Sequence, residues 1–148
     1  MDCLPFFKFG SHFLSVGLNR EREVWFAQLL YEYDTQQDMQ EALWRADGTR
    51  EGTFSIVDVN PYSWEATNIR MAALGDTLYF NADVGDFGNE LWKTDGTREG
   101  TLLVADVNSG THHGRAFSKI IGLTPAEDSL FFIADDGVHG RELWRLVP

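Results

Sequence analysis

The heptapeptide Asp47–Thr53, with the sequence DGTREGT, recurs letter for letter as Asp95–Thr101. The two copies lie 48 residues apart, and the residues around them repeat as well. Leu43-Trp44 precedes the first copy at the same distance as Leu91-Trp92 precedes the second. Self-similarity at a fixed period is the signature of a chain built from stacked repeat units.

A second match, at an offset of 52 residues, extends the repeat toward the end of the chain. Leu78-Tyr79-Phe80 becomes Leu130-Phe131-Phe132, and Glu90-Leu91-Trp92 becomes Glu142-Leu143-Trp144. We therefore predict a single β-repeat domain, with an N-terminal segment at 1–11 and units at about 12–60, 61–108 and 109–148. The last unit stops before a DGT turn of its own, so we expect it to be truncated.

One unit has the sequence pattern of four short strands. Ile69–Leu74 and Thr77–Ala82 flank the turn signal Gly75-Asp76, as expected for a β-hairpin. The other two strands are predicted at 90–94 and 101–107. Four strands in such a period is the size of a propeller blade, with a solenoid or a sandwich as alternatives. The predicted fold is all-β: about three four-stranded antiparallel units, about eleven strands in all, in an incomplete propeller-like array.

Helical patterning is confined to one stretch of the first unit, Asp34–Leu43. The spacing from Phe26 to Trp44 exceeds that from Phe80 to Trp92 by six residues. We therefore predict an insertion here that forms a turn or two of helix, with Asp34 or Thr35 as its cap.

The chain resembles the bacterial ELWxxDGT-repeat proteins over roughly residues 13–148. The motif is complete as Glu90–Thr97, has Ala42 in place of its first glutamate at 42–49, and is cut short as Glu142–Arg145. The resemblance implies a propeller-like β-repeat fold and a place in large secreted or surface proteins. It implies no established enzymatic activity. We accordingly expect an extracellular or cell-surface location, although Met1–Gly10 lacks the pattern of a secretory signal.

Composition and charge exclude several classes of protein. There are 12 basic and 23 acidic residues, a net charge of −11 that repels phosphate backbones and argues against nucleic acid as a partner. No apolar run approaches the roughly 18 residues of a membrane-spanning helix. Cys3 is the only cysteine, so an intrachain disulfide is excluded.

The repeated motif itself has a structural interpretation. Leu91 and Trp92 are adjacent in a predicted strand, so they point to opposite faces, and stacked sheets can cover both. The Asp95 carboxylate is expected to accept hydrogen bonds from amides of its own turn, with Thr97 and Thr101 bonding the same loop. A calcium loop using Asp95 and Glu99 is the alternative, but the spacing does not match an EF-hand.

The loops between the second and third strands are acidic, which leaves calcium binding open there. Their oxygen donors, spaced by glycines, are Asp83, Asp86, Asn89 and Glu90 in one copy and Asp135, Asp136 and Glu142 in the next. Asp and Asn are also ordinary turn formers. The histidines (His12, His112, His113 and His139) lack metal-ligand spacing. We therefore assign no metal ligand, no cofactor and no catalytic residue.

Residues that differ between the copies are the better candidates for recognition. In a four-strand meander these acidic loops lie at the same end as the connections between units. The non-repeating side chains there are Tyr62, Trp64, His112, His113 and Arg115. Their residue types suit contacts with sugars or peptides. For Trp64, packing beneath its own loop is the alternative.

We therefore interpret the chain as a non-enzymatic repeat module, a scaffold or adhesion surface with a protein or carbohydrate partner. A lectin-like carbohydrate binder and a fragment of a propeller hydrolase are the alternatives. Fewer than three complete units also leave strand edges unpaired. We expect either that Pro5–Phe9 pairs with Glu142–Leu146, or that the open edges drive self-association.

Overall fold

The chain folds into β-sheets, and the described residues contain no helix. The computed structural model describes residues 12–18, 24–29, 32–33, 39–45, 49–59, 70–84, 88–109 and 118–148, with side chains from Ala42 onward except that of Val59. The strands are β1 (His12–Leu18), β2 (Val24–Leu29), β3 (Glu32–Tyr33), β4 (Met39–Arg45), β5 (Phe54–Val59), β6 (Met71–Leu74), β7 (Thr77–Asp83), β8 (Asn89–Thr94), β9 (Leu102–Ala105), β10 (Ile121–Ala126), β11 (Ser129–Asp135) and β12 (Arg141–Leu146). The all-β prediction is confirmed for these residues, with the two-residue β3 as an addition.

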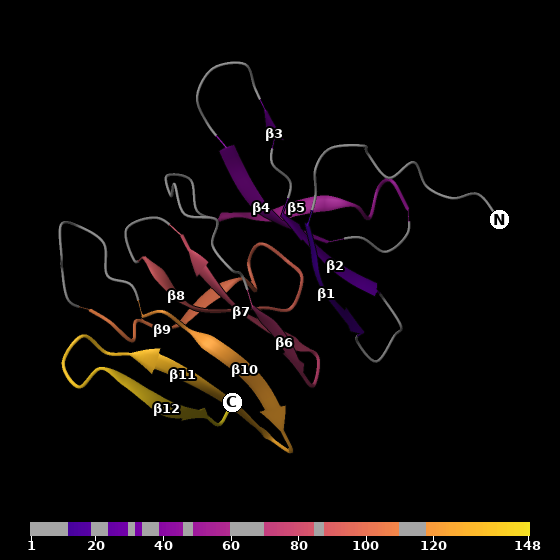
Figure 1. Cartoon of the computed structure of the whole chain (residues 1–148). Coiled ribbons are helices and arrows are strands. Elements are labelled where there is room, and N and C mark those ends of the chain that lie inside the picture. The colour runs from indigo at the N-terminus through magenta and orange to yellow at the C-terminus, as the bar shows by residue number, and fades with distance from the viewer. Residues whose placement is uncertain are drawn as a thin grey trace.

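The strands pair in the order in which they follow along the chain. Strands β6–β9 form a four-stranded sheet and β10–β12 a three-stranded sheet, while β1–β2 and β3–β5 form the remaining two. All these pairings are antiparallel, as predicted. Strand β2 also lies against β4. We call β1–β5 the first unit, β6–β9 the second unit and β10–β12 the third unit. The units follow one another from the indigo strands to the yellow ones (Figure 1).

The central strands of the second unit, β7 and β8, are buried on both faces, because the first and third units pack against either side of the sheet. Toward the first unit it presents Phe80, Ala82 and Trp92, which share a hydrophobic core with Leu43 and Ile56. Phe80 and Ala82 are 0% exposed. We call this side of a unit its upstream face, since it meets the unit that precedes it in sequence.

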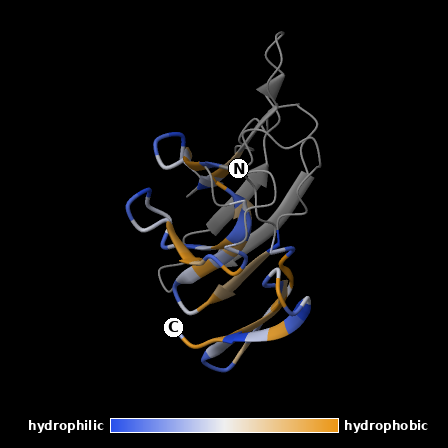
Figure 2. Ribbon diagram, turned by 90° about the vertical axis from the view of Figure 1, so that its left-hand side faces the viewer, coloured by the Kyte–Doolittle hydropathy of each residue, from blue (hydrophilic) through white to orange (hydrophobic). Residues whose placement is uncertain are grey.

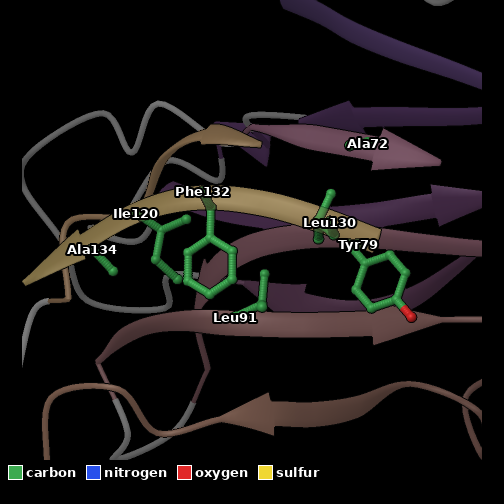
Figure 3. Close-up of a cluster of buried hydrophobic side chains, with 7 residues drawn as sticks. All are labelled: Ala72, Tyr79, Leu91, Ile120, Leu130, Phe132 and Ala134. Carbon is green, nitrogen blue, oxygen red and sulfur yellow. The ribbon is translucent and has the colours of Figure 1, made fainter. Parts of the chain in front are cut away.

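The opposite side of the second unit, its downstream face, packs against the third unit. Tyr79 and Leu91 belong here, together with Leu130, Phe132 and Ala134 from β11. Figure 3 shows these side chains meeting between the two sheets. Leu91 and its neighbour Trp92 thus lie in different cores, so the predicted division of this pair between two faces is confirmed.

The two inter-unit contacts use equivalent residues of the repeat. In the first, Leu43 and Ile56 meet Phe80 and Trp92; in the second, their equivalents Leu91 and Val104 meet Phe132 and Trp144. The strand register repeats too, with the same irregularity between Leu43 and Trp44 as between Leu91 and Trp92. Such a bulge places one extra residue on the partner strand and increases its twist. The sequence repeat is therefore also a repeat of packing.

The turns place polar residues at the ends of the strands. Figure 2 shows hydrophilic turns projecting beyond hydrophobic stretches that lie along the sheets. Gly75 and Asp76 close the β6–β7 hairpin as predicted, with Thr77 paired to Leu74. Gly75 has a φ of 62°, a left-handed conformation that glycine adopts without a Cβ clash.

The predicted helical insertion at Asp34–Leu43 is wrong where the structure describes it. Met39–Leu43 belongs to strand β4, which pairs with β3 on one side and β5 on the other. Residues with a high helix propensity adopt the strand conformation here, because pairing with β5 and burial of Leu43 outweigh their local preference for a helix. Residues 34–38 lie outside the described part of the chain.

The third unit ends in an edge strand. Among the described residues, β12 pairs only with β11, so no strand lies where β9 lies in the second unit. Leu102 of β9, which lies on the same side of the sheet as Val104, is 50% exposed. The predicted partner segment Pro5–Phe9 is outside the described residues.

The three motif tryptophans occupy equivalent strand positions but differ in burial. Trp92 is 8% exposed, which confirms its predicted core role. Trp44 and Trp144 are half-buried, so burial is graded across the three equivalent positions. Trp144 lies on the edge strand and stacks on Phe132, with ring centroids 6.4 Å apart, whereas Trp92 is flanked by strands on both sides.

Candidate functional site

The end of the sheets that carries the acidic loops also carries the connection between the second and third units. Ser118 N donates to Asn89 O at 3.3 Å, and Asp135 N donates to Ser118 O at 2.7 Å. These bonds tie the connection to the first residue of β8 and the last residue of β11. We call the described residues 83–84, 88–90, 106–109, 118–120 and 135–141 the loop end. The predicted gathering of these loops is confirmed for them, while Tyr62, Trp64, His112, His113, Arg115 and Asp86 fall outside the described residues.

Glu90, the first residue of the complete motif, is the buried centre of the loop end. Its side chain is 0% exposed, and Oε2 accepts a hydrogen bond from Val107 N at 2.8 Å. Oε1 is buried and has no hydrogen-bond partner among the described residues. The carboxyl group therefore holds the start of the connection to the third unit against β8. The equivalent Glu142 is exposed in the third unit.

Burial dominates the acid–base behaviour of Glu90. Desolvation raises the pKa of its carboxyl to about 7, against the weaker stabilisation of the anion by the Val107 amide. The nearby Asp106 charge raises the pKa further. A carboxyl with such a pKa is suited to proton transfer. Because the Glu90 side chain is 0% exposed, the shift in its pKa enters the pH dependence of folding stability.

The contribution of Glu90 to folding stability is expected to fall as the pH rises from about 4.5 to about 7. Below 4.5, Glu90 is protonated in both states; above that pH the unfolded chain ionises first, because the folded pKa is about 7. The difference between the folded and unfolded pKa values of Glu90 corresponds to a loss of about 3 kcal/mol of folding free energy at pH 8. Glu90→Gln keeps an acceptor for the Val107 amide and removes this loss, which urea denaturation at pH 5 and pH 8 measures.

The control for Glu90→Gln is Glu99→Gln, an exposed glutamate of the DGT turn. That variant is expected to show the pH dependence of the wild type. An unchanged pH dependence in Glu90→Gln would contradict a buried carboxyl at position 90.

Buried amides and hydroxyls continue from Glu90 across the loop end. Asn81 Nδ2 donates to Asn89 Oδ1 at 3.1 Å, and Ser118 Oγ donates to Asn89 O. Asp83, in register with Asn89, is 3% exposed. Asn89 and Glu90, two of the predicted cation ligands in this loop, thus form hydrogen bonds within the protein. The bonds of Asn89 link β8 to β7 and to Ser118, and the bond of Glu90 links β8 to Val107.

The loop after β11 forms an exposed cluster that sequence analysis found only in part. The Asp136 carboxylate accepts hydrogen bonds from Val138 N and His139 N, and Oδ2 lies 2.7 Å from His139 Nδ1. These bonds lower the pKa of Asp136 to about 2 and raise the pKa of His139. Glu142 completes the cluster, with one ligand atom of each residue within 4.8 Å of the others. The sequence analysis named Asp136 and Glu142 as possible cation ligands, but not His139. The sequence feature that indicates His139 is its position three residues after Asp136 and three before Glu142.

The DGT turn lies away from the loop end and is held by its own side chains. Asp95 Oδ1 accepts hydrogen bonds from Thr97 N at 2.9 Å and Thr97 Oγ1 at 2.8 Å, which lower the pKa of Asp95. Thr101 Oγ1 donates to Thr97 O at 2.6 Å. A Cβ at Gly100 would lie 2.0 Å from Asp95 Oδ1, which explains the glycine there. The predicted turn chemistry is confirmed.

Thr97→Val is expected to lower the free energy of unfolding by about 1 kcal/mol. Thr97 Oγ1 accepts a hydrogen bond from Gly100 N at 2.9 Å, and valine cannot replace it. Thr49 accepts the same bond from Gly52 N at 2.9 Å in the first unit, so Thr49→Val is the matched variant and is also expected to lower the free energy of unfolding. Losses below a few tenths of a kcal/mol in urea denaturation of both variants would contradict a structural role for this turn.

Comparisons of the chain with protein-family models, curated proteins and solved structures gave no match.

No helix in the described part of the chain is long and apolar enough to cross a membrane.

Proposed function

We propose that this chain is a non-enzymatic β-repeat module, a rigid scaffold that presents its loop end for adhesion or ligand binding. The observation that carries this proposal is the use of the repeated motif. Leu91 and Trp92 fill two cores, Glu90 bonds the connection to the next unit, and Asp95 with Thr97 closes a turn. Because these residues serve the fold, repetition of the motif needs no catalytic explanation.

The quasi-equivalent packing of successive units supports a propeller-like array as the scaffold. Each unit covers the downstream face of the one before it with a tryptophan and a phenylalanine, Trp92 with Phe80 and then Trp144 with Phe132. This arrangement fits the resemblance to ELWxxDGT-repeat proteins, and with it a place in a larger secreted or surface protein.

Binding is assigned to the loop end because loops on a rigid scaffold commonly carry recognition. The sequence-predicted contact residues His112, His113 and Arg115 belong to a connection whose described ends, 106–109 and 118–120, lie there. The partner is a protein or carbohydrate surface; the net charge of −11 argues against nucleic acid.

A glycan array probed with the labelled chain, together with a glycosidase screen, tests the proposal. Asp136→Ala alters the exposed loop end, and Glu51→Ala alters an exposed DGT turn as its control. Glycan binding weakened by Asp136→Ala alone supports a carbohydrate-binding loop end, and loss in the Glu51 variant alone contradicts it. Glycoside hydrolysis by the wild type that Glu90→Gln abolishes overturns the non-enzymatic assignment.

A further inference from the structure

The connection between the second and third units begins where a strand pairing ends early. In the first unit the pairing of β4 with β5 continues through Asp58 and Val59. In the second unit the pairing of β8 with β9 ends at Ala105. Residues 106 and 107, the repeat equivalents of Asp58 and Val59, lie beyond that point. The backbone pairing that holds this position in the first unit thus stops short of it in the second.

The Glu90 carboxyl takes the place of that pairing. Its Oε2 accepts a hydrogen bond from Val107 N at 2.8 Å, whereas the first unit has Ala42 at the equivalent position, with no side-chain acceptor. Val107 also packs against the core between the second and third units. The next residue, Asn108, lies against the loop after β11, since its Oδ1 would be 2.7 Å from a Cβ at Gly137. Glu90 therefore supports a segment that reaches the exposed part of the loop end.

This support is sensitive to the charge on Glu90. The side chain is 0% exposed, and Oε1 is buried with no hydrogen-bond partner among the described residues. An anion here leaves one oxygen without a donor from that part of the chain, and burial of such a charge is costly. Desolvation accordingly raises the pKa of Glu90 to about 7.

The described groups around the Glu90 carboxyl do not compensate a negative charge. Ala82 is its partner on β7, Ser118 approaches from the start of the third unit, and Asp106 belongs to the segment that Glu90 holds. Of these three only Asp106 carries a charge, and its negative sign opposes ionisation of Glu90. Asp83, the next acid along β7, lies on the opposite face of that strand. The first unit contributes an apolar core on this side of the sheet.

We propose that ionisation of Glu90 releases residues 106–109 from β8 while the sheets remain folded, so that the loop end loosens as the pH rises. Any opening that brings the carboxyl into water removes the cost of burying its charge. Release of this short segment breaks fewer contacts than separation of the sheets, so it is the opening that a rise in pH populates first. The opening itself does not depend on the binding function proposed for the loop end.

Native-state hydrogen exchange followed by NMR, corrected for the intrinsic exchange rate at each pH, tests the proposal. From pH 5 to pH 7.5 we expect the protection of the Val107 amide to fall about fiftyfold. At pH 7.5 its exchange should not respond to low concentrations of urea, because a local opening exposes little surface, whereas exchange of the β7 amides should quicken. Glu90→Gln should abolish the pH-dependent loss, and Glu99→Gln, in the exposed DGT turn, should retain it.

If Glu90→Gln fails to fold, the carbon-13 shift of the Glu90 carboxyl in the wild type provides the second measurement. The loss of Val107 protection must then level off near the midpoint of that titration. Three results would overturn the proposal. They are a Val107 protection that is independent of pH, a pH-dependent loss that Glu90→Gln retains, and exchange of Val107 with the same opening constant and urea dependence as the β7 amides.

Discussion

Replacing Trp92 with alanine is expected to lower the free energy of unfolding by about 3–5 kcal/mol, the range for truncating a large buried aromatic. Trp92 is 8% exposed and belongs to the core between the first and second units. Its strand is flanked by β7 and β9, so it lies in the interior of the sheet. Urea denaturation followed by circular dichroism at low micromolar protein measures the loss.

Trp144→Ala is the matched comparison for Trp92→Ala. Trp144 occupies the equivalent position, paired with Phe132 as Trp92 is paired with Phe80. It is half-buried on the edge strand, so its loss should be clearly smaller. A Trp92→Ala loss under about 1 kcal/mol would contradict the core role.

Leu91→Ala is expected to destabilise the chain by about 2–5 kcal/mol, whereas Leu143→Ala should cost less than about 0.5 kcal/mol. The two leucines hold the same position in their units but are 0% and 73% exposed. The substitution is the same at both positions, so a larger loss of unfolding free energy at Leu91 reports the packing of the third unit on the downstream face of the second.

This pair of variants is best measured at nanomolar protein by tryptophan fluorescence, where association of copies is negligible. Equal losses at the two positions would contradict the packing of β10–β12 on the second unit.

Much of the fold follows from the repeat in the sequence. The DGT turn, the Gly75-Asp76 hairpin and the split of Leu91 and Trp92 between two faces were all predicted from local chemistry and alternation. These features depend on neighbouring residues, and the repeat offset carries them from one unit to the next. The order of strands within a sheet follows for the same reason.

The failures have a common physical origin in contacts between distant residues. The stretch 34–43 has good helix formers, and only pairing with β5 makes its described part a strand. The repeat itself argues against a helix at this position, because Ala42–Arg45 aligns with residues 90–93 of a predicted strand. Likewise, the different burial of Trp92 and Trp144 depends on whether a strand lies beyond the motif strand.

The location of the loop end was predicted from the sequence, but the interactions of its side chains were not. Glu90 was considered as a cation ligand, and the structure makes it a buried acceptor for the Val107 amide, 17 residues away in sequence. His139 was missed because a histidine in a loop has no partner until the loop closes on Asp136.

The central claim, that each unit packs its motif leucine into a core made with the next unit, is tested most directly by a double-mutant cycle. Leu43 and Trp92 lie in the same core, whereas Trp144 packs against the other one. Unfolding free energies of Leu43→Ala, Trp92→Ala and their double variant should show a coupling of about 1 kcal/mol or more. The cycle of Leu43→Ala with Trp144→Ala should be additive within about 0.5 kcal/mol. Additivity in the first cycle, or equal coupling in both, would contradict the stacking of these units.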